Sequence, residues 1–452
     1  MSITKTIETL FQKYIPSPFV IAILLTLLTM ILAFLFTENP SETSHPITIL
    51  KFWEEGIWNN NLLVFAYQMM LILVLGHVLV LSKPMNWLIS KITVYATDTV
   101  SAVILVSVTT MLVAFFNWGL GLIFGAIMAR KVGEAALQKG FKINYPLVGA
   151  AGYIGLMIWH GGMSGSAPLK VAEEGHLSTM MKGILPSEKL ATIPEIITSQ
   201  QTIFSWWNLL IFGILLIVIP FTFYLLARNG KTTELPDFST TKETPRDQEK
   251  NDKLDNSKLL AIGFGFILMT AFFARYWGKS LSPNMLNFLM LGLGIILHGN
   301  FKNFLKAIEE AIGGASGILI QFPLYFGIMG IMKSTGMVTM ISDAFIAVAT
   351  ETTLPIFTFF SAGLVNIFVP SGGGQWAIQG PIVIESALSL GVPLPKAIMA
   401  LAYGDQVTNM LQPFWALPLL GITKLKAKEI LPYTLILMVV GSTVYILGLL
   451  VL

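Results

Sequence analysis

Long apolar runs separated by short polar stretches recur along the whole chain. The run at 18–36 reads PFVIAILLTLLTMILAFLF, and another fills 430–452. Runs of this length can cross the roughly 30 Å hydrocarbon core of a bilayer as helices of about 20 residues. The pattern predicts membrane-spanning helices over these ranges: 18–36, 62–82, 146–168, 203–227, 259–277, 283–298, 307–332, 395–420 and 430–452.

Basic residues between the runs indicate which ends face the cytoplasm, because short loops rich in Lys and Arg are retained on that side. They fall at Lys5, Lys13, Lys83, Lys91, Arg130, Lys131, Lys139, Lys142, Lys302, Lys306, Lys424, Lys426 and Lys428. The stretch after the first run instead carries Glu38, Glu42, Glu54 and Glu55, with Lys51 as its one basic residue. We expect that stretch to be a loop on the outside.

Two further apolar segments, 98–128 and 355–385, are predicted to be re-entrant helical hairpins. Basic groups flank 98–128 on both sides, so both of its ends are expected in the cytoplasm. The segment is too long for one untilted span and too short for two. Its tip is predicted at 116–121 (FNWGLG). By the same reasoning 355–385 enters from the outside and turns within 366–381, which reads NIFVPSGGGQWAIQGP.

The chain divides near its middle into two halves that resemble each other. Residues 228–258 form a polar linker of mixed charge, predicted to be a flexible cytoplasmic tether between 1–227 and 259–452. Asn117 matches Asn366 and Pro146 matches Pro395 at one offset of 249, while Tyr153 with Tyr403 and Pro168 with Pro418 are separated by 250. The predicted helix at 259–277 is an extra span, and because of it the second half crosses the membrane in the opposite orientation to the first half. The predicted fold class is an all-α polytopic membrane protein with inverted-topology repeats, two re-entrant hairpins and two broken helices.

The composition agrees with a membrane protein. Hydrophobic residues make up 54% of the 452 and charged residues 12%, whereas soluble proteins have roughly 45–50% and about 25%. Cysteine is absent, which excludes disulfides, thiolate metal sites and cysteine nucleophiles. The chain begins MSITKTIETLFQKYIPSP, a polar amphipathic stretch without a cleavage-site pattern, so no removable signal peptide is expected.

Two sequences predict breaks inside spans: 158–169 (IWHGGMSGSAPL) and 402–413 (AYGDQVTNMLQP). Non-helical backbone at membrane depth is tolerated only where protein buries it or where it lines a watery cavity. A broken helix frees N–H groups that attract an anion and C=O groups that can coordinate a small cation. We therefore expect the two hairpin tips and the two breaks to hold an anionic solute together with a coupling cation.

Each of these features has a purely structural alternative. Single glycines in membrane helices often only allow close packing, although three in a row beside Ser371 and Gln375 favour binding by the backbone. His160 is equally well explained as an interior histidine bonded to a carbonyl. A carboxylate within a span, such as Asp405, usually faces a cavity or a partner. Aromatic packing explains the tryptophans in and beside these segments as well as a pocket lining does, at Trp118, Trp159, Trp376 and Trp415.

Sequence motifs for catalysis are missing. The chain contains no HExxH metal motif, Gly-x-Ser-x-Gly elbow or Walker phosphate loop, and no TVGYG channel filter. We expect no enzyme, no ATP-driven pump, no cofactor, no assigned metal site and no nucleic-acid partner.

Four long motifs resemble the bacterial short-chain fatty acid transporter family associated with acetoacetate and butyrate degradation. They read FFNWGLGLIFGAIMARKV, IWHGGMSGSAPL, FVPSGGGQWAIQGP and AYGDQVTNMLQPFWALPLLGI, and the resemblance spans nearly the whole chain. That family belongs to a larger ion transporter superfamily, which includes citrate and dicarboxylate symporters. The resemblance implies inverted repeats, a scaffold that dimerises, and a transport unit that moves in an elevator-type motion.

Carried over by motif, the resemblance implies which residues frame the binding site. The first tip contributes Asn117, Gly119 and Gly121; the second contributes Asn366, Ser371, Gly372, Gly373, Gly374 and Gln375; the broken helices contribute His160, Ser164, Ser166, Asp405, Thr408 and Asn409. Dicarboxylate symporters of the superfamily carry Ser-Asn-Thr at both tips. Here the tips read Phe-Asn-Trp and Val-Pro-Ser, so their sodium-site geometry does not transfer directly.

These features predict a secondary transporter of the bacterial inner membrane that imports short-chain carboxylates such as butyrate or acetoacetate. Coupling to H⁺ and coupling to Na⁺ remain open, and a homodimer follows from the resemblance alone. Trp376, Phe414 and Trp415 are expected to form an apolar wall, and no arginine is expected inside the spans. The alternatives are a symporter of the same fold for another small anion, such as a dicarboxylate or amino acid, and an uncoupled facilitator.

Overall fold

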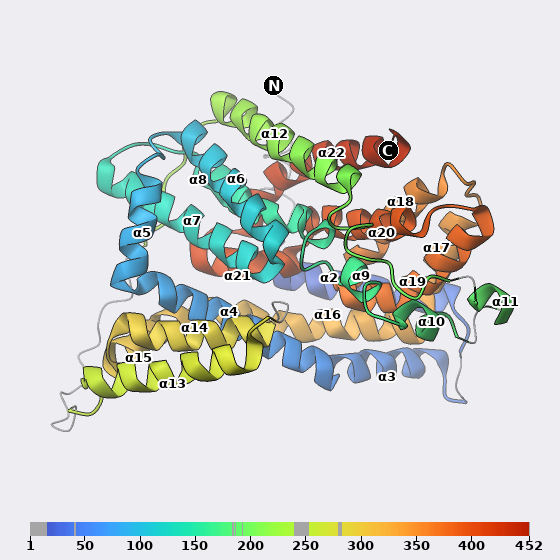
Figure 1. The fold of residues 1–452 in the computed structure, drawn as a ribbon, viewed down its shortest axis with the longest axis horizontal. Helices are drawn as coiled ribbons and strands as arrows, with labels where there is room; N and C mark the ends of the chain where they lie inside the picture. The colour runs from blue at the N-terminus through green and yellow to red at the C-terminus, as the bar shows by residue number, and fades with distance from the viewer. Residues whose placement is uncertain are drawn as a thin grey trace.

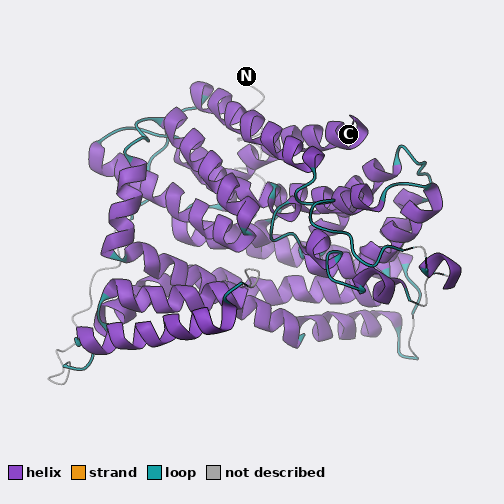
Figure 2. Cartoon of the chain, viewed as in Figure 1, coloured by secondary structure: helices purple, strands orange, loops and turns teal. Residues whose placement is uncertain are grey.

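The computed structural model describes residues 16–39, 42–182, 185, 187–191, 193–238, 253–278 and 283–451. Within these ranges the chain is helical, apart from turns, loops and one isolated bridge between Lys182 and Leu185 (Figure 2). The start of the chain with Lys5 and Lys13, and residues 239–252 of the predicted linker, lie outside the described residues. The prediction about a signal peptide concerns the same N-terminal stretch.

Seven of the described helices are long and apolar enough to cross a membrane. They are α2 (Pro18–Phe36), α4 (Asn60–Leu81), α6 (Thr99–Phe116), α12 (Trp206–Asn229), α13 (Lys258–Tyr276), α16 (Ser316–Ser334) and α22 (Ala427–Val451). A shorter apolar helix, α14 (Pro283–His298), agrees with the predicted span there. The all-helical polytopic fold is therefore confirmed.

Six short helices among the described residues were not predicted: α3 (His45–Ile57), α5 (Lys83–Thr93), α10 (His176–Met181), α11 (Ser187–Leu190), α15 (Phe301–Ala311) and α17 (Met337–Ile346). The expected outside loop after the first span is wrong in part, because α3 occupies it and packs along α16. Glu54 and Glu55 lie on the exposed side of α3. The predicted span at 307–332 begins later than expected, because α15 and the 3-10 turn η3 (Ile312–Ala315) precede α16.

The order of elements repeats. The sequence α2, α3, α4, α5 leads into the first hairpin, and α14, α15, α16, α17 leads into the second. Each hairpin is followed by a broken segment and then by one long helix, α12 or α22. The helix α13 stands outside this order, as expected of the additional element. The order fits the predicted division of the chain into two repeats, which stays a prediction.

Both hairpins turn where a polar side chain caps the returning helix. The first consists of α6 and α7 (Trp118–Lys139), and the second of α18 (Leu354–Phe368) and α19 (Gly372–Leu390). Asn117 has an extended backbone, and its Oδ1 accepts the Leu120 N–H at 2.9 Å. Ser371 caps α19 in the same way, accepting the Gly374 N–H at 3.2 Å. A polar cap replaces the hydrogen bond that the chain reversal removes.

The helix α7 continues beyond the predicted end of the hairpin, and this corrects two expectations. Arg130 and Lys131, expected in a loop, lie within α7, and Arg130 is buried. Its Nε donates to Glu134 at 2.8 Å, and its Nη1 lies 3.1 Å from Nε2 of His77 on α4. An arginine therefore does lie inside the apolar part of the fold. Glu134 neutralises it, since a buried charge requires a partner.

In Figure 1, α3, α4 and α13 to α16 lie along the lower side of the molecule, and the hairpins, α12 and α22 lie above them, while α2 packs along α16. We call α2, α3, α4 and α13 to α16 the basal layer, and the two hairpins, the two broken segments, α12 and α22 the site layer. In Figure 1, α5 stands at one end of the molecule and α17 at the other, each joining the basal layer to a hairpin. Aromatic stacking joins the layers, with the rings of Phe414 and Phe322 3.8 Å apart between centroids.

Two glycines of the first hairpin tip differ in the space around them, which gives a matched pair of substitutions. A Cβ at Gly121 would lie 2.5 Å from Cα of Ala114 on α6, whereas at Gly119 the nearest atom would be 3.6 Å away. We expect Gly121→Ala to lower the free energy of unfolding by about 1–3 kcal/mol through overpacking. Gly119→Ala should cause no loss. Thermal unfolding in detergent measures both, and equal melting temperatures would contradict the tight hairpin.

Candidate functional site

Both predicted breaks are present. The first segment runs through α8 (Tyr145–Tyr153), the 3-10 turns η1 (Ile154–Met157) and η2 (Trp159–Gly161), and the short α9 (Ser166–Lys170). The second runs through α20 (Leu394–Thr408), η4 (Asn409–Leu411) and α21 (Pro413–Thr423). The backbone leaves helical geometry at Gly162 and Gln412, which are both extended.

The two broken segments are hydrogen-bonded to each other. The Tyr153 hydroxyl donates to the carbonyl oxygens of Asn409 at 2.8 Å and Gln412 at 3.0 Å. In the other direction, Gln406 Oε1 accepts the N–H groups of His160 at 2.7 Å and Gly161 at 3.1 Å. Each break therefore supplies the partners for main-chain groups that the other break leaves unpaired.

Each hairpin tip is bonded to the broken segment that follows it in the chain. In the first half, the Trp118 N–H donates to Ser164 Oγ at 2.9 Å. In the second half, Asn366 Nδ2 donates to Thr408 Oγ1 at 3.0 Å and to Asn409 Oδ1 at 2.9 Å. These contacts involve four of the predicted site residues, which are Ser164, Asn366, Thr408 and Asn409.

His160 and Asp405 form the central contact between the halves. Nδ1 of His160 lies 2.5 Å from Oδ2 of Asp405, and both side chains are at most 1% exposed. Nε2 of His160 accepts the Ala167 N–H at 3.0 Å, which assigns the imidazole proton to Nδ1. The ring also stacks on Trp159. Oδ1 of Asp405 has no hydrogen-bond partner among the described residues.

The three-glycine tip lies directly against this pair. A Cβ at Gly372 would stand 2.8 Å from Cε1 of His160 and from Cη2 of Trp159, so only glycine permits the observed approach. At Gly373 the nearest atom would be Ser166 Oγ at 3.8 Å. Both residues begin α19, where N–H groups have no partner within the helix. The Gly374 N–H, by contrast, is used by the Ser371 cap.

Three predicted site residues point elsewhere. Gly121 packs against Ala114 within the first hairpin, and Gly119 faces Ile72 and Leu286 of the basal layer. Gln375 lies between the arms of the second hairpin, where its Nε2 donates to Ala362 O and to Gln379 Oε1.

The expected apolar wall is only partly assembled. Phe414 and Trp415 lie together with Trp118, whose ring centroid is 5.2 Å from that of Trp415. Trp376 packs in a separate cluster, and its indole N–H donates to His176 at 3.0 Å. Trp159 instead lies at the site, where it stacks on His160 and contacts Trp118.

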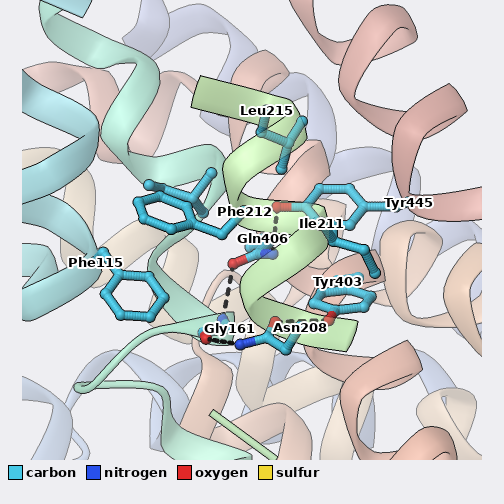
Figure 3. Close-up of a pocket in the computed structure, with 10 residues that line it drawn as sticks. Phe115, Gly161, Asn208, Ile211, Phe212, Leu215, Tyr403, Gln406 and Tyr445 are labelled. Carbon is cyan, nitrogen blue, oxygen red and sulfur yellow. Dashed lines mark hydrogen bonds between the residues drawn. The ribbon is translucent and has the colours of Figure 1, made fainter. Parts of the chain in front are cut away.

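Sequence reasoning missed the residues that support the site from behind. Figure 3 shows a pocket behind Gly161, lined from α6, α12, α20 and α22. Its polar side chains are paired: Tyr403 donates to Asn208 at 2.6 Å, Asn208 to Gly161 O at 3.0 Å, and Gln406 to Tyr445 at 2.8 Å. This pocket therefore holds the first break in place rather than offering free groups to a solute. The sequence signal that could have identified these residues was Asn208, a single asparagine near the start of the predicted span at 203–227.

Comparison with known proteins gives a full-length match. The model of the family described as "Short chain fatty acid transporter" matches residues 1–452. The "Putative short-chain fatty acid transporter" of Escherichia coli (strain K12) is 36% identical over 450 residues, covering 97% of this chain and 96% of the relative. The protein of the same name from Haemophilus influenzae is 36% identical over 457 residues, covering 99% of this chain and 98% of the relative.

Two solved structures are also similar over most of the chain. The YdaH transporter of Alcanivorax borkumensis, described as having an unusual topology, is 15% identical with a TM-score of 0.39 and covers 96% of this chain and 97% of its own. MtrF of Neisseria gonorrhoeae, reported among antimetabolite efflux pumps, is 16% identical with a TM-score of 0.38 and covers 98% of this chain and 96% of its own.

The contact between Trp376 and His176 predicts a pH-dependent stability. Burial of the imidazole, assisted by the nearby Lys170, lowers the pKa of His176 below its usual 6.5, while Glu173 opposes the shift. The folded protein therefore binds fewer protons here than the unfolded chain. The neutral imidazole of His176 therefore contributes fully to the free energy of unfolding at pH values above its usual pKa of 6.5, and this contribution is lost as the pH falls below 6.5. Protonation also removes the acceptor for the Trp376 N–H.

We expect the melting temperature of the wild type to fall as the pH is lowered through this range, and the fall to be smaller for His176→Gln. The glutamine amide oxygen can accept the indole N–H and does not titrate. Melting curves in detergent at several pH values measure the difference. Parallel pH profiles for the two proteins would show that His176 does not contribute.

Proposed function

The chain belongs to the short-chain fatty acid transporter family, and on that premise we propose that it imports a short-chain monocarboxylate together with one cation. The family is one of transport proteins rather than enzymes, and the apolar helices make the chain a multi-pass protein of the bacterial inner membrane. Butyrate and acetoacetate are the proposed substrates. The following contacts support the proposal.

The tip of the second hairpin is the proposed carboxylate site, and it is the observation that carries the proposal. The Gly372 and Gly373 N–H groups start a helix of 19 residues, so they bear partial positive charge and lack intrahelical partners. Ser166 Oγ faces the same place. Arg130, the one arginine that is buried among the described residues, is already paired with Glu134. Recognition by main-chain N–H groups suits a single carboxylate, whereas a dicarboxylate usually calls for additional positive charge.

The apolar end of the substrate is proposed to lie against the indole rings beside His160. Trp159 contacts both the Gly372 position and Trp118, and Trp118 contacts Trp415. A wall of aromatic rings can bury the short alkyl chain of butyrate, and burial contributes about 0.8 kcal/mol for each CH₂ group. The proposed site thus combines one anion-binding end with one apolar end.

The site layer is proposed to move against the basal layer in an elevator-type motion. All of the hydrogen bonds between hairpin tips and broken segments lie within the site layer, so it can move as a unit. Its contact with the basal layer is formed in part by stacked and edge-on rings, including Phe414 on Phe322 and Trp415 against Phe65. Such apolar surfaces can slide past each other, although the hydrogen bond between Arg130 on α7 and His77 on α4 would have to break during the motion. The family resemblance supports a homodimer built through the basal layer.

Uptake into proteoliposomes tests the proposal. We expect labelled acetoacetate to accumulate when an inward gradient of the coupling cation is imposed, with protons and sodium tested separately. Acetoacetate is preferred over butyrate because a more polar acid crosses bilayers more slowly without protein. Protein-free liposomes measure that background. Uptake that never exceeds the background, with either substrate and under either gradient, would refute the transport proposal.

Substitution of the cap on α19 tests the location of the carboxylate site. Ser371→Ala removes the acceptor of the Gly374 N–H, so the start of α19 loses its fixed position at a cost of about 1 kcal/mol. We expect uptake to fall about tenfold or more if these N–H groups bind the substrate. Ser257→Ala is the matched control, because Ser257 caps α13 by the same bond to Leu260 and lies in the basal layer. Equal uptake by both variants would place the carboxylate elsewhere.

A further inference from the structure

We propose that the coupling cation is a proton and that it binds at Oδ1 of Asp405, within the pair formed with His160. This inference rests on the proposed function, since it names the ion that accompanies the carboxylate. Its starting point is the buried, unpartnered oxygen of Asp405 beside the tip of the second hairpin.

The contacts of the pair leave one place for an additional proton. The bond between Nδ1 of His160 and Oδ2 of Asp405 already holds one proton. Nε2 of His160 is occupied, because it accepts the Ala167 N–H. Oδ1 of Asp405 is free among the described residues. A proton arriving there breaks no hydrogen bond, and it changes the net charge of the pair from minus one to zero.

A sodium ion fits the site poorly. Hard cations take about six oxygen ligands, and in broken-helix transporters freed carbonyls supply many of them. Here seven carbonyls at the breaks and beside the hairpin tips already accept protein donors, which leaves fewer oxygens for a cation. Phe115 O accepts from Met163, Leu156 O from Asn409 and Met157 O from Tyr445; Asn366 O and Ile367 O accept from Gln412; Asn409 O and Gln412 O accept from Tyr153. A proton needs only one oxygen.

The surroundings of Asp405 bring no second charge to the pair. On its own helix and on α22, Tyr403 and Tyr445 are hydrogen-bonded hydroxyls. Within the described residues, α18 carries no ionisable side chain, and η2 contributes His160 alone. Lys170 on α9 and Glu385 on α19 are exposed. The charge of the Asp405 and His160 pair therefore dominates this region.

The position of Gly372 links the proton to the carboxylate. The start of α19 lies close to His160, so its N–H groups lie next to the charge of the His160 and Asp405 pair. In this proposal those N–H groups face one net negative charge both when the site is empty and when it holds the carboxylate and the proton. In the empty site that charge is the pair itself, and in the loaded site it is the carboxylate beside a protonated pair. Carboxylate without the proton would place two negative charges together, which is unfavourable. Reciprocal linkage then makes each ligand favour the other, and one carboxylate moves with one proton without net charge.

Binding measurements in detergent test the link without transport. Intrinsic tryptophan fluorescence can report acetoacetate binding, because Trp159 and Trp118 lie beside the site. Over about pH 6–9, we expect the Kd of the wild type to rise with pH by up to about tenfold for each pH unit, because each carboxylate bound takes up one proton. Asp405→Asn resembles the protonated acid, so its Kd should be independent of pH. Glu385→Gln, the same acid-to-amide change at an exposed position of α19, should retain the wild-type slope.

Two further measurements, of proton uptake on binding and of exchange against accumulation in proteoliposomes, test whether Asp405 binds the coupling proton. In weakly buffered solution, wild-type protein should take up one proton for each acetoacetate bound near pH 8, as a pH indicator dye would show. In proteoliposomes, Asp405→Asn should exchange labelled for unlabelled acetoacetate but fail to accumulate it under an inward proton gradient. A wild-type slope in the Asn variant, accumulation by that variant, or binding without proton uptake would each overturn the inference. The dye measurement needs only wild-type protein, so it decides even if the variant fails to fold.

Failure of this inference is distinguishable from failure of the proposed function. If wild-type protein neither binds nor exchanges acetoacetate or butyrate, the proposed function is wrong. If it binds and exchanges the carboxylate but its Kd is independent of pH and accumulation follows sodium, only the assignment of the proton to Asp405 is wrong.

Discussion

The structure depends on pairing the main-chain groups that two broken helices leave open inside an apolar protein. Unpaired backbone is costly at membrane depth, where water is not available to replace the missing bonds. Here each break is completed by side chains from the other half: Tyr153 bonds the carbonyls of the second break, and Gln406 receives the amides of the first. Neither broken segment could be stable alone. The need for mutual pairing is what brings His160 next to Asp405.

Pairing is selective, and this selectivity gives the site its chemical character. Donors of the protein occupy several carbonyls at the breaks and beside the tips, such as Asn366 O and Ile367 O, whereas two N–H groups at the second tip remain without intrahelical partners. The result is a buried region that attracts negative charge and offers few oxygen ligands. The basal layer contacts the aromatic end of the proposed site through rings, as Phe322 and Phe65 illustrate. Its hydrogen bond between His77 and Arg130 instead lies further along α7, away from the hairpin tip.

Local sequence signals predicted the parts of the fold that local chemistry determines. The caps at Asn117 and Ser371 stand at the hairpin turns, and glycine and proline mark both breaks. Short helices such as α3 and α5 escaped prediction because their apolar faces are too short to stand out beside full spans. Arg130 was misplaced because the half-buried Glu134, one turn later on α7, pairs with it and lets a basic residue lie within a helix instead of in a loop. The pairing of His160 with Asp405 joins positions 245 residues apart, and no local pattern encodes it.

The bond from the Trp118 N–H to Ser164 has a consequence for the duplicated architecture. In the first hairpin, the main-chain N–H at the start of the returning helix is thus already hydrogen-bonded. The corresponding N–H in the second hairpin, that of Gly372, has no partner within its helix. The two hairpin turns are capped alike, yet the first tip uses its main-chain donor in an internal bond, while the second keeps the corresponding donors without intrahelical partners. Under the proposed function, two similar hairpins would therefore contribute unequally to binding, and only the second tip would receive the carboxylate.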